Sequence, residues 1–203
     1  MKFIKENYLK VWKFLKENLG NTIRICTIIF LISALVCLLI GFYKVEMIKP
    51  IIQSLTDSKS EVLIENGKIS DVGLIKNNTI ACGISIVYGI IPFIFLTMIP
   101  TTLNGFILGI VLGLGKATSG ASALAIFIVG ILPHGIFELP ALIISMAMGM
   151  YLCLNLTLKI FRRGKEKIYK ILLEYVRIFV LVILPMLILA GVIEAYITPL
   201  LLQ

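Results

Sequence analysis

The chain contains one histidine, His134, and a glutamate four residues later, Glu138, in an otherwise apolar stretch. Side chains four residues apart lie on one face of a helix, so the imidazole and the carboxylate can hydrogen-bond to each other. Pro133, Gly135 and Pro140 surround the pair. A proline removes a backbone hydrogen bond from a helix and leaves a carbonyl free. The pattern therefore predicts a polar pair at a helix break.

Three interpretations of this pair stay open. In the first, His134 and Glu138 have a structural role and satisfy each other and the backbone groups around the break. In the second, the pair is an ion or proton site at a discontinuous helix. In the third, it belongs to a metal-dependent intramembrane protease, which needs three protein ligands and a base. One histidine with scattered cysteines does not supply that set, so the sequence predicts no metal, no cofactor and no catalytic residue.

The composition indicates that membrane helices position the pair. Hydrophobic residues make up 59% of the 203 residues and charged residues only 15%, whereas ordinary globular domains are about 45–50% apolar. The net charge of +8 is concentrated in residues 1–24 and 159–177, beside apolar stretches. This distribution is typical of cytoplasmic segments of membrane proteins. Because no recognition motif accompanies the charge, we expect a lipid bilayer and not a nucleic acid as its partner.

The predicted fold is an all-α polytopic membrane bundle without a soluble catalytic domain. Residues 1–20 are expected to form an amphipathic interfacial helix and residues 21–203 the bundle. About 20 apolar residues cross a hydrocarbon core of roughly 30 Å. The expected spans are about 22–43, 77–99, 101–115, a half-helix at 119–133 followed by 136–160, and 171–195, with an extracytoplasmic loop at 44–76.

The charge pattern predicts five net crossings of the cell membrane, with the N-terminus and the 159–170 loop in the cytoplasm. The half-helix at 119–133 is too short to cross and is expected to be discontinuous or re-entrant. Such backbone is tolerated only where protein or water surrounds it. Glu194 is expected near the outer end of the last span, where it reaches the headgroups without a special role.

The N-terminal helix has two open interpretations. Apolar residues recur at helical spacing, and lysines occupy the opposite face; the apolar set is Ile4, Tyr8, Val11, Leu15 and Leu19, and the basic set is Lys2, Lys5, Lys13 and Lys16. A basic helix of this kind can lie in the interface of an anionic leaflet. Alternatively, it packs against a partner or on this protein's own cytoplasmic face.

Two stripes of small residues predict close helix packing. Gly105, Gly109 and Gly113 recur every four residues, and so do Ala141, Ser145 and Gly149. Small side chains allow the backbones of membrane helices to approach closely. The stripes suit packing inside the bundle or a homo-oligomer equally well.

The region from about Asn77 to Arg163 resembles the stage II sporulation protein M family of integral membrane proteins. The resemblance depends on Asn104-Gly105 at the start of a glycine-rich helix and on the stretch from Leu132 to Ala141, with the His-Gly-two-residue-Glu-Leu pattern as its most specific part. That pattern is commoner in the broader family, which also occurs in organisms that do not sporulate, than in the sporulation protein of bacilli.

The resemblance implies a polytopic membrane protein without enzymatic activity of its own. The sporulation member assembles with stage II sporulation proteins D and P, which cut peptidoglycan during engulfment of the forespore. The resemblance therefore implies membrane-anchored peptidoglycan hydrolases as partners and a scaffold role. No family site of established chemistry transfers to His134 or Glu138, and a small ion- or proton-coupled transporter that uses this pair is the alternative function.

Overall fold

The computed structural model describes residues 2–43, 64–65, 68–119, 122–163 and 167–201. Almost all of these residues are helical, apart from a small antiparallel pair of two-residue strands, β1 (Ile64–Glu65) and β2 (Lys68–Ile69). The helical elements, in chain order, are α1 (Lys2–Glu17), α2 (Gly20–Tyr43), α4 (Asp71–Val87), η1 (Tyr88–Ile90), α5 (Met98–Ser119), α6 (Ala123–Ile126), η2 (Phe127–Ile131), α7 (Leu132–Ile160), α8 (Ile168–Ile178), η3 (Phe179–Ile183), α9 (Leu184–Val192), η4 (Ile193–Ile197) and α10 (Thr198–Leu201).

Four of the described helices are long and apolar enough to cross a membrane. They are Gly20–Tyr43, Met98–Gly115, Ala123–Ile160 and Ile168–Leu201. Only 17–28% of the residues in their most apolar stretches are buried inside the protein. Large apolar side chains therefore cover the outside of the bundle, as is suitable for contact with lipid. The chain is a multi-pass membrane protein; the predicted count of five crossings stays a prediction.

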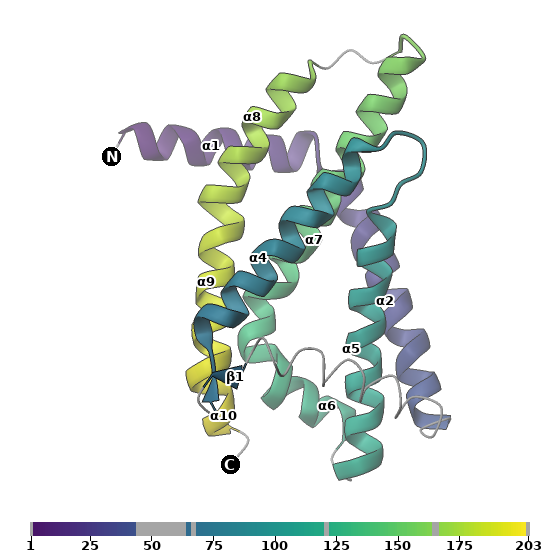
Figure 1. Ribbon diagram of the computed structural model, residues 1–203, viewed down its shortest axis with the longest axis vertical. Coiled ribbons are helices and arrows are strands. Elements are labelled where there is room, and N and C mark those ends of the chain that lie inside the picture. The colour runs from purple at the N-terminus through teal and green to yellow at the C-terminus, as the bar shows by residue number, and fades with distance from the viewer. Residues whose placement is uncertain (1, 44–63, 66–67, 120–121, 164–166, 202–203) are drawn as a thin grey trace.

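Figure 1 shows how these helices are arranged. Helices α2 and α5 lie side by side, while α4, α7 and the α8–α10 helix form a second group. Helix α6 slopes between the two groups at the lower end, and α1 lies across the upper part of the bundle. Helix α7 is central and contributes many of the buried residues, among them Met146, Met148 and Leu152. The core thus centres on the helix that carries His134 and Glu138.

Helix α1 packs on the bundle through one edge. Val11 and Leu19 are buried, and the Phe14 ring meets the rings of Tyr151 and Tyr175 edge to face, with centroids 6.1 and 6.3 Å apart. The side chain of Trp12, by contrast, is 68% exposed. The packing on the protein's own surface therefore uses one part of the apolar face, and the part around Trp12 remains available to lipid.

Three π-helical segments follow from the positions of prolines. Each segment ends two residues before a proline: η2 precedes Pro133, η3 precedes Pro185 and η4 precedes Pro199. The ring of a proline clashes with the carbonyl four residues earlier, and an inserted π-type turn moves that carbonyl aside.

This geometry corrects the predicted break around Pro133 and Gly135. The helix continues from Ala123 to Ile160, and Pro140 also lies inside it. The expected half-helix at 119–133 and the expected span at 136–160 are thus parts of one helical element with a π-type distortion between them. The sequence indicated where the hydrogen-bond pattern changes. The backbone accommodates the proline through a π-type turn and stays helical.

The chain does leave the helical conformation between η1, which follows α4, and α5. Helix α4 begins at Asp71 because the Ser70 hydroxyl caps it, accepting a hydrogen bond of 3.1 Å from the Gly73 amide. Regular helix ends at Ile90, and residues 91–97 turn back with positive φ angles at Phe93 (71°) and Phe95 (48°). The expected span at 77–99 is therefore displaced toward the N-terminus, and residues 71–76 are helical, not loop.

The two basic regions lie toward the same end of the bundle. The C-terminal end of α7, the start of α8 and helix α1 occupy the upper part of Figure 1, and the C-terminus lies at the lower end. This arrangement is the one that the charge pattern requires, since both regions were predicted on one side. The cytoplasmic location of that side stays a prediction.

Candidate functional site

Three potential ligands from two distant parts of the chain meet in the bundle. His134 and Glu138 lie near the start of α7, and Glu194 lies in η4. One ligand atom from each of the three side chains falls within 4.8 Å of the other two. All three residues are partly buried. We call this group the His–Glu–Glu cluster.

The local structure explains why these side chains converge. The spacing of four residues places His134 and Glu138 on one face of α7. That face meets the C-terminal helix, since α7 packs along α9 and η4. Glu194 is located in the π-type turn before Pro199, and π-type turns change the direction in which the following side chains point. π-Helical segments accordingly occur in both helices of the cluster, η2 just before His134 and η4 around Glu194.

Thr198 orients the histidine. Its Oγ1 atom lies 3.4 Å from Nδ1 of His134 and donates a hydrogen bond of 3.4 Å to the carbonyl oxygen of Ile193. With its proton donated to that carbonyl, the hydroxyl oxygen of Thr198 can accept an Nδ1–H of His134. This arrangement favours the tautomer whose Nε2 atom carries the lone pair.

Helix α4 forms a further side of the site. The Cys82 thiol of α4 interacts with the charge of Glu138 and with the Ser145 hydroxyl. At the other end of α4, the Tyr196 hydroxyl donates a hydrogen bond of 3.4 Å to the Asp71 carboxylate. Helix α4 thus packs against both helices that carry the cluster.

The chemistry of the cluster is that of a cation or proton site. Two carboxylates close together disfavour the state in which both are charged, unless a proton or a cation is held between them. A neutral imidazole with two carboxylates is also a nitrogen and oxygen ligand set of the kind that zinc accepts. These side chains lie within helices that can span a membrane, where a carboxylate costs on the order of 3 kcal/mol on insertion scales.

Comparison with known proteins identifies the family. The model of the family "Stage II sporulation protein M" matches residues 26–199. The chain belongs to this family. Its membership links the protein to sporulation and confirms the resemblance found in the sequence.

The match to the stage II sporulation protein M family begins within α2, ends within α10 and includes every residue of the His–Glu–Glu cluster. It leaves out α1, which is the part of the chain that packs across the bundle. Comparisons with curated proteins and with solved structures found no match.

The small-residue stripes lie at helix contacts. A Cβ atom added to Gly105 would lie 2.1 Å from the Ser33 hydroxyl of α2, and one added to Gly109 would lie 2.1 Å from the Ala34 carbonyl. A Cβ added to Gly113 would lie 2.9 Å from the Cα atom of Gly41. In this family member, the first stripe therefore serves the close approach of α5 to α2.

The second stripe faces α4. Ala141 and Ser145 are fully buried, and a Cβ on Gly149 would lie 2.2 Å from the Ser85 carbonyl. Gly135 has no such constraint, because an added Cβ would be no closer than 3.4 Å to a neighbouring side chain. Both stripes thus contribute to packing within one chain, and Gly135 lies inside the helix at a position without a steric need for glycine.

Sequence reasoning did not assign Glu194 or Thr198 to the site. Glu194 was expected at the headgroups, but the structure brings it to His134 and Glu138. One signal could have identified it, since an acidic residue inside an apolar span is itself a sign of a functional site. Its partners could not be identified, because Glu194 is far from His134 and Glu138 in the sequence and only the tertiary structure brings the three together.

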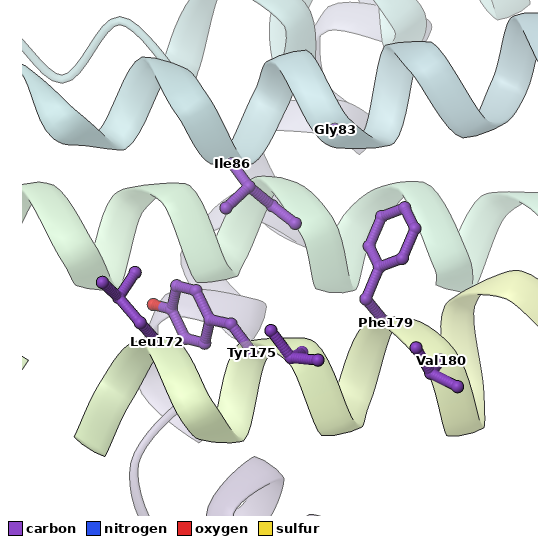
Figure 2. A pocket seen from close by; sticks show the side chains of 7 residues that line it. Gly83, Ile86, Leu172, Tyr175, Phe179 and Val180 are labelled. Atoms are coloured by element: carbon purple, nitrogen blue, oxygen red, sulfur yellow. The ribbon is translucent and has the colours of Figure 1, made fainter. Parts of the chain in front are cut away.

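Three apolar grooves on the bundle surface do not include the cluster. One, with a volume of about 350 Å³, lies between α4 and the α8–η3 helix. Figure 2 shows Ile86 of α4 opposite Tyr175 and Phe179, with Gly83 beside them on α4. The other two, of about 570 and 500 Å³, lie beside α1, the first against α2 and α7 and the second against α7 and η3, and both are lined by residues that include Trp12 and Ile144.

Proposed function

We propose that this protein is a non-enzymatic membrane scaffold that assembles with membrane-anchored, peptidoglycan-remodelling enzymes during engulfment. Its family membership supports a role in sporulation. In this proposal the partners carry out the wall chemistry, and this protein holds them together in the cell membrane with its N-terminus in the cytoplasm.

The groove between α4 and α8 carries this proposal. Its lining is almost wholly apolar, so it suits an apolar helix as well as it suits lipid. Gly83 leaves the α4 side of the groove without a side chain at this point, and a Cβ added here would meet no atom within 4 Å. The other glycines of this region, Gly89 and Gly149, are in contact with each other and are used inside the bundle.

An unused glycine in an apolar groove suits a transmembrane helix. Helices in a membrane associate through small residues that permit close approach, because apolar burial alone gives no advantage over lipid. A lipid chain gains nothing specific from a missing side chain on α4. We therefore assign the groove to the membrane anchor of a partner enzyme, with lipid or a second copy of this chain as the other occupants that the experiment distinguishes.

The test is affinity purification from sporulating cells of the native organism. Tagged wild-type protein is expected to recover peptidoglycan hydrolases. Gly83→Leu fills the groove without disturbing an internal contact and is expected to lose most of them. Gly130→Leu is the matched control, since a Cβ added to Gly130 would also meet no atom within 4 Å, but this glycine lies in η2, away from the groove.

Three outcomes contradict the proposal. Recovery of no hydrolase by the wild-type protein removes the scaffold role. Equal recovery by Gly83→Leu and wild type removes the groove as the docking site. Recovery of only a second, differently tagged copy of this chain, lost in Gly83→Leu, makes the groove a dimer interface instead.

A second candidate function is supported by the addition of Glu194 to the predicted pair. Two carboxylates and an imidazole in a membrane helix bundle are typical of proton relays and ion-coupled transporters. Purified protein in liposomes with a pH-sensitive dye inside tests this alternative. A proton flux that Glu138→Gln abolishes without unfolding the protein would favour it over the scaffold, and absence of flux would remove it.

A further inference from the structure

The His–Glu–Glu cluster has the composition of a metal site in which each ligand comes from a helix. We propose that His134, Glu138 and Glu194 bind a divalent transition-metal cation of the zinc class, which joins α7 to the C-terminal helix. The proposal is independent of the scaffold role, because it concerns a different surface and predicts metal binding by the isolated protein.

The geometry brings three ligands within reach of one ion. Zinc binds imidazole nitrogen and carboxylate oxygen at about 2.0–2.2 Å, and in a tetrahedral site this places ligand atoms about 3.3 Å apart. The three ligand atoms already lie within 4.8 Å of one another. Rotation of the two glutamate side chains is the movement that a bound ion would require to close the remaining distance.

The hydrogen bonding of His134 points to the same ligand. A metal-bound histidine donates its second ring N–H to a neighbouring acceptor, which fixes the tautomer and the orientation of the ring. Thr198 lies 3.4 Å from Nδ1 and directs its own proton to the Ile193 carbonyl. Nε2 is then the nitrogen whose lone pair is available to a cation.

Charge favours a divalent cation over a monovalent one. Two carboxylates with a neutral imidazole have a charge of −2, and a divalent ion neutralises them within the helix bundle. The imidazole favours zinc and related metals over magnesium, which prefers oxygen ligands and retains its waters. Three protein ligands leave a fourth position, which water or a group from a partner protein can fill.

The experiment uses full-length protein purified in detergent, treated with a chelator and titrated with Zn²⁺ against a competing chromophoric chelator. We expect one Zn²⁺ per chain and a rise of several degrees in the thermal unfolding midpoint, since ligand binding stabilises the folded state by mass action. Mg²⁺ is expected to give neither effect. X-ray absorption at the zinc edge should show nitrogen and oxygen neighbours with an imidazole pattern.

Variants assign the site. His134→Gln, Glu138→Gln and Glu194→Gln are each expected to lose at least tenfold in zinc affinity and to lose the thermal shift. Glu174→Gln is the matched control, because it removes a carboxylate from the same long helix, where Glu174 instead pairs with Arg177. Cys82→Ala controls for the α4 thiol that is under the electrostatic influence of Glu138, and it is expected to retain zinc.

The proposal is overturned if wild type binds no more zinc than Glu194→Gln does, as when the carboxylates hold only a proton. Sulfur neighbours in the absorption spectrum, together with loss of zinc in Cys82→Ala, would also overturn it. If a glutamine variant does not fold, the absorption spectrum of the wild-type protein still decides, since it identifies the ligand atoms without a substitution.

Discussion

The Nδ1 atom of His134 lies 3.4 Å from the hydroxyl oxygen of Thr198, across the contact between α7 and the C-terminal helix, and the two residues are 64 positions apart in the chain. Thr198 is nearly buried, with 7% of its surface exposed, and follows directly after the π-helical segment that carries Glu194. One short segment therefore supplies both a possible ligand and the group that orients the histidine.

We predict that Thr198→Val weakens zinc binding by roughly tenfold or more, because outer hydrogen-bond partners of metal ligands typically contribute 10–100-fold in affinity. Valine has a similar shape, so the helix contact is retained while the acceptor is lost. The competition titration measures the change. Thr102→Val is the control, since the Thr102 hydroxyl donates to Met98 within α5 at 2.9 Å; an equal loss in both variants would contradict an orienting role for Thr198.

Gly109 is expected to be among the most sensitive positions for packing. An alanine there would place its Cβ 2.1 Å from the Ala34 carbonyl, so α2 and α5 must separate. We predict that Gly109→Ala lowers the free energy of unfolding by about 1–3 kcal/mol, which is typical of overpacking. Titration of the purified protein with a denaturing detergent, followed by circular dichroism, measures this loss.

The control for that measurement is Gly83→Ala. The added methyl group at Gly83 meets no atom within 4 Å, so the internal packing is unchanged. Alanine is also the better helix former by about 1 kcal/mol. We therefore expect Gly83→Ala to be neutral or slightly stabilising, and a loss as large as that of Gly109→Ala would contradict the packing argument.

Trp12 is expected to lie in the membrane interface. It is the only tryptophan in the chain, and its side chain is 68% exposed although it lies next to the buried Val11. Amphipathic rings concentrate at headgroup level, and basic helices bind anionic leaflets there. In anionic nanodiscs we predict that Trp12 fluorescence is quenched more by a shallow spin-labelled lipid than by a deep one, and little by aqueous iodide.

A second tryptophan position calibrates this experiment. The Trp12→Phe, Leu31→Trp double variant moves the fluorophore to an exposed position in the middle of α2, where Leu31 is 57% exposed. We expect the deep spin label to quench this variant most. Strong quenching of wild-type Trp12 by iodide would show that α1 stays in water.

Topology gives a further prediction from the charge distribution. Single cysteines at Glu17 and Arg163, in a background without native cysteines, are expected to react with a membrane-impermeant maleimide only after the cells are permeabilised. A cysteine at Gln203 is expected to react in intact cells, as five crossings require. Reaction of all three positions on one side would contradict five crossings.

Some features of this protein followed from the order of its residues alone. The apolar stretches defined the helices that can span a membrane, because their composition excludes a solvated surface. Pro133 marked where helical hydrogen bonding changes, because the chemistry of proline is local. The glycine stripes also predicted close helix contacts, because a stripe without side chains is visible in the sequence even when the partner helix is unknown.

Other features depended on which helices meet. Proline was expected to break the helix near His134, but a π-type turn keeps it continuous, and the turn expected between the spans 77–99 and 101–115 lies earlier, at residues 91–97. Part of the apolar face of α1 packs on the bundle and part is exposed. The helical periodicity of the sequence does not predict which part does which. These outcomes reflect packing energies that compete with local preference.

The His–Glu–Glu cluster shows the division most clearly. Spacing on one helix placed His134 and Glu138 together, because four residues make about one helical turn. Only the tertiary structure added Glu194 and Thr198, by packing the last helix along α7 and turning its end through η4. The pair is a property of the sequence, whereas the three-ligand site exists only because the start of α7 and the end of the next long helix are held in contact.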